Sequence, residues 1–114
     1  MELVLDLKKR YSYADYLTWA DDRMRELIDG FIKSMSPAAG LKHQEVIGIL
    51  IRDFGIYIKK NKGKCKVFPA PFDVRLPVNG ERENDKIYNV VQPDICIVCD
   101  MSKLDRRGCL ERPT

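Results

Sequence analysis

The chain has 114 residues and a mass of 13.2 kDa, which is room for one domain around a single core. Apolar residues make up 45% and charged residues 32%, close to the average of soluble globular proteins, which argues against a disordered or membrane-spanning chain. The net charge of +3 permits an anionic partner but does not identify one.

The N-terminal segment MELVLDLKKRYSY carries acidic residues among its first apolar ones and has no basic stretch followed by an apolar one. It therefore does not have the pattern of a signal peptide, and we expect a cytoplasmic protein. The four cysteines, Cys65, Cys96, Cys99 and Cys109, are then expected to be reduced.

The first half of the sequence predicts a short helix, a hairpin and a long helix. Residues 12–20 begin with a capping serine and favour a short helix. The pair Asp29-Gly30 between apolar runs predicts a hairpin with strands over 24–28 and 31–35. A turn-rich link over 36–40 leads to a helix that ends near 61–63, where Gly63 suits a left-handed cap. One stripe of this helix, facing the core, holds His43, Ile47, Leu50, Phe54 and Tyr57 or Ile58.

The second half of the sequence changes to period two, which favours strands. Residues 64–67 and 72–76 alternate in polarity around a proline-rich bend. Residues 77–88 read as a polar surface loop or hairpin tip, and a buried strand follows in NVVQPDICIVCD. Residues 102–114 look charged and irregular. The order predicts an α+β fold, in which one main helix packs on a sheet.

Asp94 stands directly before the apolar run Ile95 to Cys99. A carboxylate at the start of a buried strand needs a partner, which can be a metal ion, a cation or a hydrogen-bond donor. Mg²⁺ is typically held by one or two carboxylates together with phosphate oxygens. The alternative is a turn cap or an ion pair with a lysine or arginine.

Glu26 and His43 are the other candidate site residues. On a strand, Glu26 shares a face with Met24 and Ile28, but taken by itself it is better explained by a salt bridge to Arg23, Arg25 or Lys33. His43, the one histidine in the sequence, lies in the first turn of the long helix and could touch a phosphate or orient a carboxylate. The alternative is a hydrogen-bonded histidine at the edge of the core.

Two further patterns carry both a functional and a structural interpretation. Cys96 and Cys99 form a C-x-x-C, but residues three apart on a strand face opposite sides, which favours core cysteines over a zinc site. Lysines at the end of the helix could follow a nucleic-acid backbone or simply form a solvated helix end. This run consists of Lys59, Lys60, Lys62, Lys64 and Lys66.

Four segments together resemble the Uma2 family, a bacterial group assigned to the restriction-endonuclease-like superfamily. They are YSYADYLTW, RELIDGFIKSMSPAAGLKHQ, VFPAPFDVRL and VVQPDICIV, and the resemblance runs from about Tyr11 to Asp105. It implies a mixed sheet flanked by helices and a metal-dependent endonuclease centre of the PD-(D/E)XK kind, with Mg²⁺ as the cofactor and DNA as the substrate.

The resemblance also implies roles for individual residues. Pro93-Asp94 matches the family's PD pair, which makes Asp94 the expected catalytic metal ligand, and Glu26 matches the acidic residue of the first hairpin. Gln92 and the pair His43-Gln44 match supporting positions. Independently of the resemblance, the basic run makes Lys59, Lys60 and Lys62 the expected nucleic-acid contacts.

The sequence departs from the family pattern after the PD strand. The family's second acidic strand, with its glutamate and lysine, has no counterpart here, because Glu111 is followed by Arg112 and Pro113. We therefore expect a C-terminally truncated fold with impaired cleavage, and a homo-oligomer that covers exposed strand edges. The alternative is a non-catalytic module that binds nucleic acid or a protein.

Overall fold

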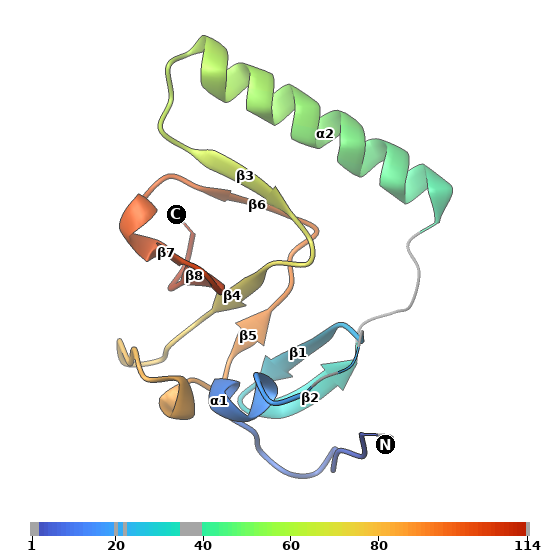
Figure 1. Ribbon diagram of the computed structural model, residues 1–114, viewed down its shortest axis with the longest axis vertical. Coiled ribbons are helices and arrows are strands. Elements are labelled where there is room, and N and C mark those ends of the chain that lie inside the picture. The colour runs from blue at the N-terminus through green and yellow to red at the C-terminus, as the bar shows by residue number, and fades with distance from the viewer. Residues whose placement is uncertain (1–2, 20, 22, 35–39, 114) are drawn as a thin grey trace.

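The computed structural model describes residues 3–19, 21, 23–34 and 40–113 of the chain. The described residues form two α-helices and eight strands, with α1 before β1, α2 between β2 and β3, and two short 3₁₀ segments between the later strands (Figure 1). The helices are α1 (Tyr13–Tyr16) and α2 (Leu41–Lys60), and the 3₁₀ segments are η1 (Asn84–Lys86) and η2 (Met101–Lys103). The strands are β1 (Arg25–Ile28), β2 (Phe31–Ser34), β3 (Lys66–Pro69), β4 (Asp73–Arg75), β5 (Val90–Val91), β6 (Ile95–Val98), β7 (Leu104–Asp105) and β8 (Gly108–Leu110).

Six of the strands form one mixed sheet in the order β2-β1-β5-β4-β8-β7. Strands β4 and β8 pair in parallel, with Val74 opposite Cys109, whereas the other neighbours are antiparallel. The turn between β1 and β2 has positive φ at both Asp29 (51°) and Gly30 (85°), as a primed hairpin turn requires. The predicted hairpin is therefore confirmed, and so is the α+β class.

The second sheet has two strands, β3 and β6, and α2 lies beside β3 at the opposite end of the view from β1 and β2 (Figure 1). Prolines separate the two sheets. Pro69 ends β3, Pro71 stands between β3 and β4, and Pro93 stands between β5 and β6. Proline cannot donate to a strand ladder, so each long extended segment leaves one sheet and enters the other at these residues.

Two clusters of buried side chains form the core. One joins α1 to the larger sheet and consists of Tyr13, Leu27, Ile87, Val90 and Leu110. The other joins the two sheets and consists of Val74, Cys96, Val98 and Cys109. No residue of α2 is fully buried, and its predicted stripe is only half-buried at Ile47, Leu50, Phe54 and Ile58. His43, assigned to that stripe, is exposed, because the helix lies on one narrow two-stranded sheet instead of a broad one.

Several boundaries differ from those predicted. The first helix has a single turn, capped by Ser12 and Asp15 in a capping box, instead of reaching residue 20. The left-handed residue after α2 is Lys62 (φ 52°) and not Gly63. Residues 35–39, which include most of the predicted link, lie outside the described residues.

The C-terminal segment is ordered and was wrongly predicted to be irregular. It contains η2, β7 and β8, and β8 inserts beside β4, where Cys109 and Leu110 are buried. The apolar residues of this segment are too few and too scattered for a strand pattern, so only the long-range pairing with β4 reveals it.

The prediction that all four cysteines are reduced is wrong for two of them. Cys65 and Cys99 form a disulfide, whereas Cys96 and Cys109 are buried free thiols. Lys66 pairs with Val98, so the next residues along each strand, Cys65 and Cys99, stand opposite each other with their Cα atoms 3.9 Å apart. Cys96 is the core cysteine that the sequence predicted, and Cys99 is not. The cytoplasmic location stays a prediction.

Candidate functional site

Asp94 lies between β5 and β6, in the segment that crosses from one sheet to the other. Its side chain is 64% exposed, and the nearest basic group is Nε2 of His43, 3.6 Å from Oδ1 of Asp94. Its main-chain oxygen accepts a hydrogen bond from the Ala70 N–H at 3.1 Å, which ties the two proline-containing crossings together. The sequence predicted this carboxylate at the start of a buried strand. In the structure, Pro93 instead places it on the surface.

Glu26, on β1, is directed to the same crossing. Its Oε2 atom accepts a hydrogen bond of 2.8 Å from the main-chain N–H of Gln92, two residues before Asp94. The salt bridge considered for Glu26 is not formed within the described part of the chain, because Arg25 pairs instead with Asp21 at 2.6 Å. The structure therefore connects Glu26 to Asp94 through the main chain of Gln92.

The side chain of Gln92 is the link between the crossing and the core. It is only 5% exposed, and its Oε1 atom accepts from the Phe72 N–H at 2.8 Å. Its Nε2 atom donates to the hydroxyl of Tyr16 at 3.0 Å and to Oδ1 of Asp73. Because both ends of the amide are engaged, Gln92 fixes the main chain that presents Asp94.

Asp73 accepts hydrogen bonds from two tyrosines in the same buried network. The hydroxyl of Tyr13 donates to its Oδ2 atom at 2.6 Å, and the hydroxyl of Tyr16 donates to Oδ1 at 3.3 Å. Burial and the Asp73 carboxylate raise the pKa of Tyr13 well above its usual value, and the same two causes raise the pKa of Tyr16 to about 12. Both phenols are therefore protonated donors near neutral pH.

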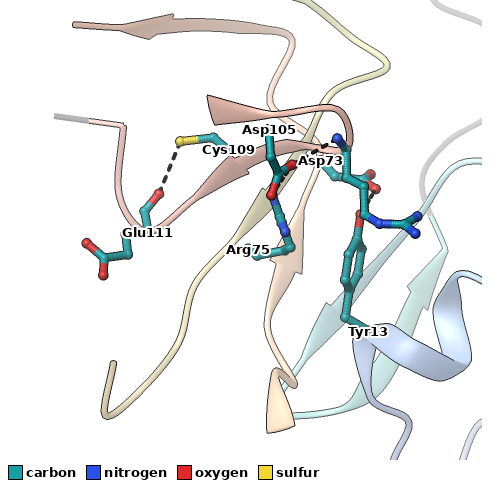
Figure 2. A network of polar contacts seen from close by, with 7 residues as sticks. Tyr13, Asp73, Arg75, Asp105, Cys109 and Glu111 are labelled. Atoms are coloured by element: carbon teal, nitrogen blue, oxygen red, sulfur yellow. Dashed lines mark hydrogen bonds and ion pairs between the residues drawn. The ribbon is translucent and has the colours of Figure 1, made fainter. Parts of the chain in front are cut away.

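A second polar connection runs from β4 to the C-terminal hairpin. The Arg75 side chain is 3% exposed, and its Nη2 atom donates to Oδ1 of Asp105 on β7 at 2.7 Å (Figure 2). Burial opposes the charge of Asp105, but the hydrogen bonds from Arg75 and from the Arg107 main chain, together with the charge of Arg75, outweigh it and lower the pKa of that carboxyl group. The Arg75 guanidinium also lies 5.3 Å from the ring centre of Tyr13.

A divalent cation would find few ligands at the crossing. Among the described residues, no group of three or more His, Cys, Asp or Glu side chains is arranged to hold a metal ion. Asp94 offers one exposed carboxylate, and Glu26 uses one of its oxygens on the Gln92 N–H. A hard cation such as Mg²⁺ takes six oxygen ligands, so the described residues do not fit a closed metal centre.

The predicted nucleic-acid contacts lie away from this crossing. Lys59 and Lys60 end α2, and Lys62 follows in the turn after it. All three side chains are exposed. Lysines at this position also interact favourably with the helix dipole, so their place fits a solvated helix end as well as a nucleic-acid contact.

Sequence reasoning did not single out the residues that form the buried network. Asp73 and Arg75 alternate with apolar neighbours on a strand, which reads as a polar, solvent-facing side. The structure buries Arg75, and Tyr13 and Tyr16 reach Asp73 from a helix about sixty residues away in sequence. The signal that could have drawn notice to Asp73 is its place in VFPAPFDVRL, one of the segments that resemble the family.

The mixed sheet, the helix beside it and the Pro93-Asp94 crossing define an α+β protein with a restriction-endonuclease-like fold. A family model, Uma2, described as "Putative restriction endonuclease", matches residues 13–114, and the chain belongs to this family. No curated protein matches the sequence. None of the described helices is long and apolar enough to cross a membrane.

Proposed function

We propose that this protein is a nuclease-like domain that binds DNA and whose Asp94 contributes one ligand to a weakly held divalent cation. Membership of the Uma2 family supports a nuclease-like function and DNA as the partner. The observation that carries the role of Asp94 is the double anchorage of its crossing, by Glu26 on the main chain of Gln92 and by Asp73 on its side chain. Such anchorage holds an exposed carboxylate in a fixed position.

The same geometry supports impaired cleavage. Nuclease centres that use metal ions need the ion to be fixed by several protein ligands. At the crossing, the described residues supply the exposed carboxylate of Asp94 and a histidine that is 43% exposed. We infer that the chain by itself binds Mg²⁺ weakly and cleaves DNA slowly.

Replacing Asp94 by alanine should abolish saturable Mn²⁺ or Mg²⁺ binding. The carboxylate is the one direct oxygen ligand that the crossing offers, so its loss removes the charge that attracts the cation. Isothermal titration of the metal into the intact chain, with and without a short DNA duplex, measures this change. Asp85→Ala is the matched control, because Asp85 is an exposed carboxylate on η1.

Two results would contradict the proposal. Unchanged metal binding in Asp94→Ala would remove Asp94 from the site. Rapid Mg²⁺-dependent cleavage of plasmid DNA by the wild-type chain, lost in the Asp94 variant, would show that cleavage is not impaired.

The second candidate function is a non-catalytic module that binds nucleic acid or a protein. The absence of a three-residue metal cluster among the described residues favours it. DNA binding that falls steeply with salt but does not change with EDTA or with Asp94→Ala would establish this function in place of the first. For both candidate functions, Lys59, Lys60 and Lys62 are the proposed contacts to the phosphate backbone when DNA is bound.

We also propose that the protein associates with copies of itself through α2. Apolar side chains are exposed on one side of the helix, at Val46 (46%), Ile49 (48%), Ile56 (57%) and Tyr57 (69%). The radius of gyration is 15.5 Å, compared with about 13 Å for a compact domain near this size.

Light scattering at micromolar concentration should therefore give a mass above 13.2 kDa. The double variant Ile49→Glu/Ile56→Glu should restore the monomer, whereas Lys86→Glu, at an exposed residue of η1 outside the helix, should not. A monomeric wild-type chain would contradict this.

A further inference from the structure

The turn between β7 and β8 consists of two arginines. Asp105 pairs with Gly108 across the hairpin, so Arg106 and Arg107 form the whole connection, and both side chains are exposed. The Asp105 carboxylate accepts from the main-chain N–H of Arg107 at 2.8 Å and from Nη2 of Arg75 at 2.7 Å. The turn is therefore fixed to the sheet through a buried arginine beneath it, and its position is defined before any ligand arrives.

These arginines line a pocket of about 230 Å³ together with residues from two other parts of the chain. Arg82, from the loop before η1, contributes a third exposed guanidinium, and Arg75 belongs to the same lining. Asp105 is the one acidic residue of the lining. Within the described residues, the side chains of Arg82, Arg106 and Arg107 form no ion pair. Several guanidinium groups gathered around a small space without matching carboxylates create a positive potential that favours an anion.

Arg75 adds an independent observation. Its Nε atom is buried and has no hydrogen-bond partner in the described part of the chain. Nearly all buried polar groups in folded proteins are hydrogen-bonded, to the protein, to water or to a ligand. Arg75, which also lines the arginine pocket, therefore keeps one guanidinium N–H for which the described residues supply no acceptor.

We propose that this pocket binds the phosphate of a phosphate ester. Guanidinium groups present planar pairs of donors that match phosphate oxygens, which makes arginine better suited to this task than lysine. The pocket is smaller than the ~300–1,000 Å³ typical of sites that enclose a whole small molecule. It therefore holds the phosphate and leaves the rest of the ligand outside. The site goes beyond the proposed function, because Asp94, Glu26 and His43 are not part of its lining.

The test compares the wild-type chain with Arg106→Gln/Arg107→Gln, using three probes in separate titrations. The probes are inorganic phosphate, a deoxynucleoside monophosphate and a 12-nucleotide single-stranded DNA, measured by calorimetry or fluorescence anisotropy. The substitution should weaken binding of the phosphate-ester probes at least tenfold, and it should lower the slope of log K against log salt for DNA by about 1 to 2. Binding of the monophosphate as well as DNA identifies a site for free nucleotides, whereas binding of DNA alone identifies a contact to the strand backbone.

Two control variants keep the result specific. Lys8→Gln/Lys9→Gln removes the same charge from two exposed lysines near the N-terminus that belong to neither proposed contact, and Arg106→Lys/Arg107→Lys keeps the charge but loses the paired donors. The first should retain more binding than the arginine-to-glutamine variant, and the second should bind more weakly than the wild-type chain. Thermal unfolding verifies that every variant is folded.

Absence of binding for all three probes would overturn the proposal, as would an equal or greater loss in the Lys8/Lys9 variant. Metal titration of the arginine variant reports separately on Asp94, so failure of the pocket and failure of the proposed function are distinguishable.

Discussion

Replacing Asp73 by alanine should lower the free energy of unfolding by about 3 kcal/mol, because the buried Tyr13 hydroxyl loses its hydrogen-bond acceptor and the Gln92 amide loses one of its two acceptors. The side chain of Tyr13 is fully buried and that of Gln92 nearly so, so water cannot replace the carboxylate without opening the core. A loss of this size is a large part of the stability of a small domain. Urea unfolding followed by circular dichroism measures it.

Asp85→Ala is the matched control for this prediction. It removes an exposed carboxylate and should change the free energy of unfolding by less than about 0.5 kcal/mol. The double variant Tyr13→Phe/Asp73→Ala should be less destabilised than the sum of the two single changes, because each removes one side of the same contact. Additive losses would show that the Tyr13–Asp73 hydrogen bond does not carry the effect.

Replacing Gly108 by alanine should destabilise the protein by about 4 kcal/mol, because two costs combine at this residue. Gly108 has a φ of 137°, which residues with a side chain rarely adopt. A Cβ atom at this position would also overlap the main-chain oxygen of Asp73, which lies on the parallel neighbour β4. Since the obstructing atom belongs to the backbone of a paired strand, it cannot move aside without separating β8 from β4. Thermal unfolding would show the effect as a large fall in Tm.

The variant Gly80→Ala separates the two costs. Gly80 also has a positive φ, 76°, but no atom lies within 4 Å of the position that a Cβ would take. It should therefore cost about 1 kcal/mol, the strain of the backbone conformation alone. If Gly108→Ala lowered the free energy of unfolding no more than Gly80→Ala does, the close contact between β8 and β4 would not exist in the protein.

Both predictions concern the same place in the fold. Asp73 lies on β4 and pairs with Gly108 of β8, while its carboxylate holds Gln92 next to the crossing that carries Asp94. Gly108 in turn begins the strand that follows Arg106 and Arg107. Strand β4 thus supports both the proposed metal ligand and the proposed phosphate pocket, which lie on different segments of the chain.

The parts of the fold that depend on neighbouring residues could be predicted from the sequence. Asp29 and Gly30 determine the hairpin because only a few residue types tolerate positive φ, and the apolar spacing after Leu41 determines the long helix. These features are local, so composition and spacing suffice to recognise them.

The contacts that make a site were decided by the tertiary structure alone. Asp73 meets Tyr13 across sixty residues of sequence, Arg75 meets Asp105 across thirty, and Cys65 meets Cys99 across thirty-four. No periodicity within a segment reports which strand will pair with which, since many pairings satisfy the same pattern of apolar residues. The sequence by itself therefore determined the hairpin, the long helix and the candidate carboxylates Asp94 and Glu26. The pairing of β4 with β8, which depends on long-range packing, decided which polar side chains are buried, which lie exposed and which face one another.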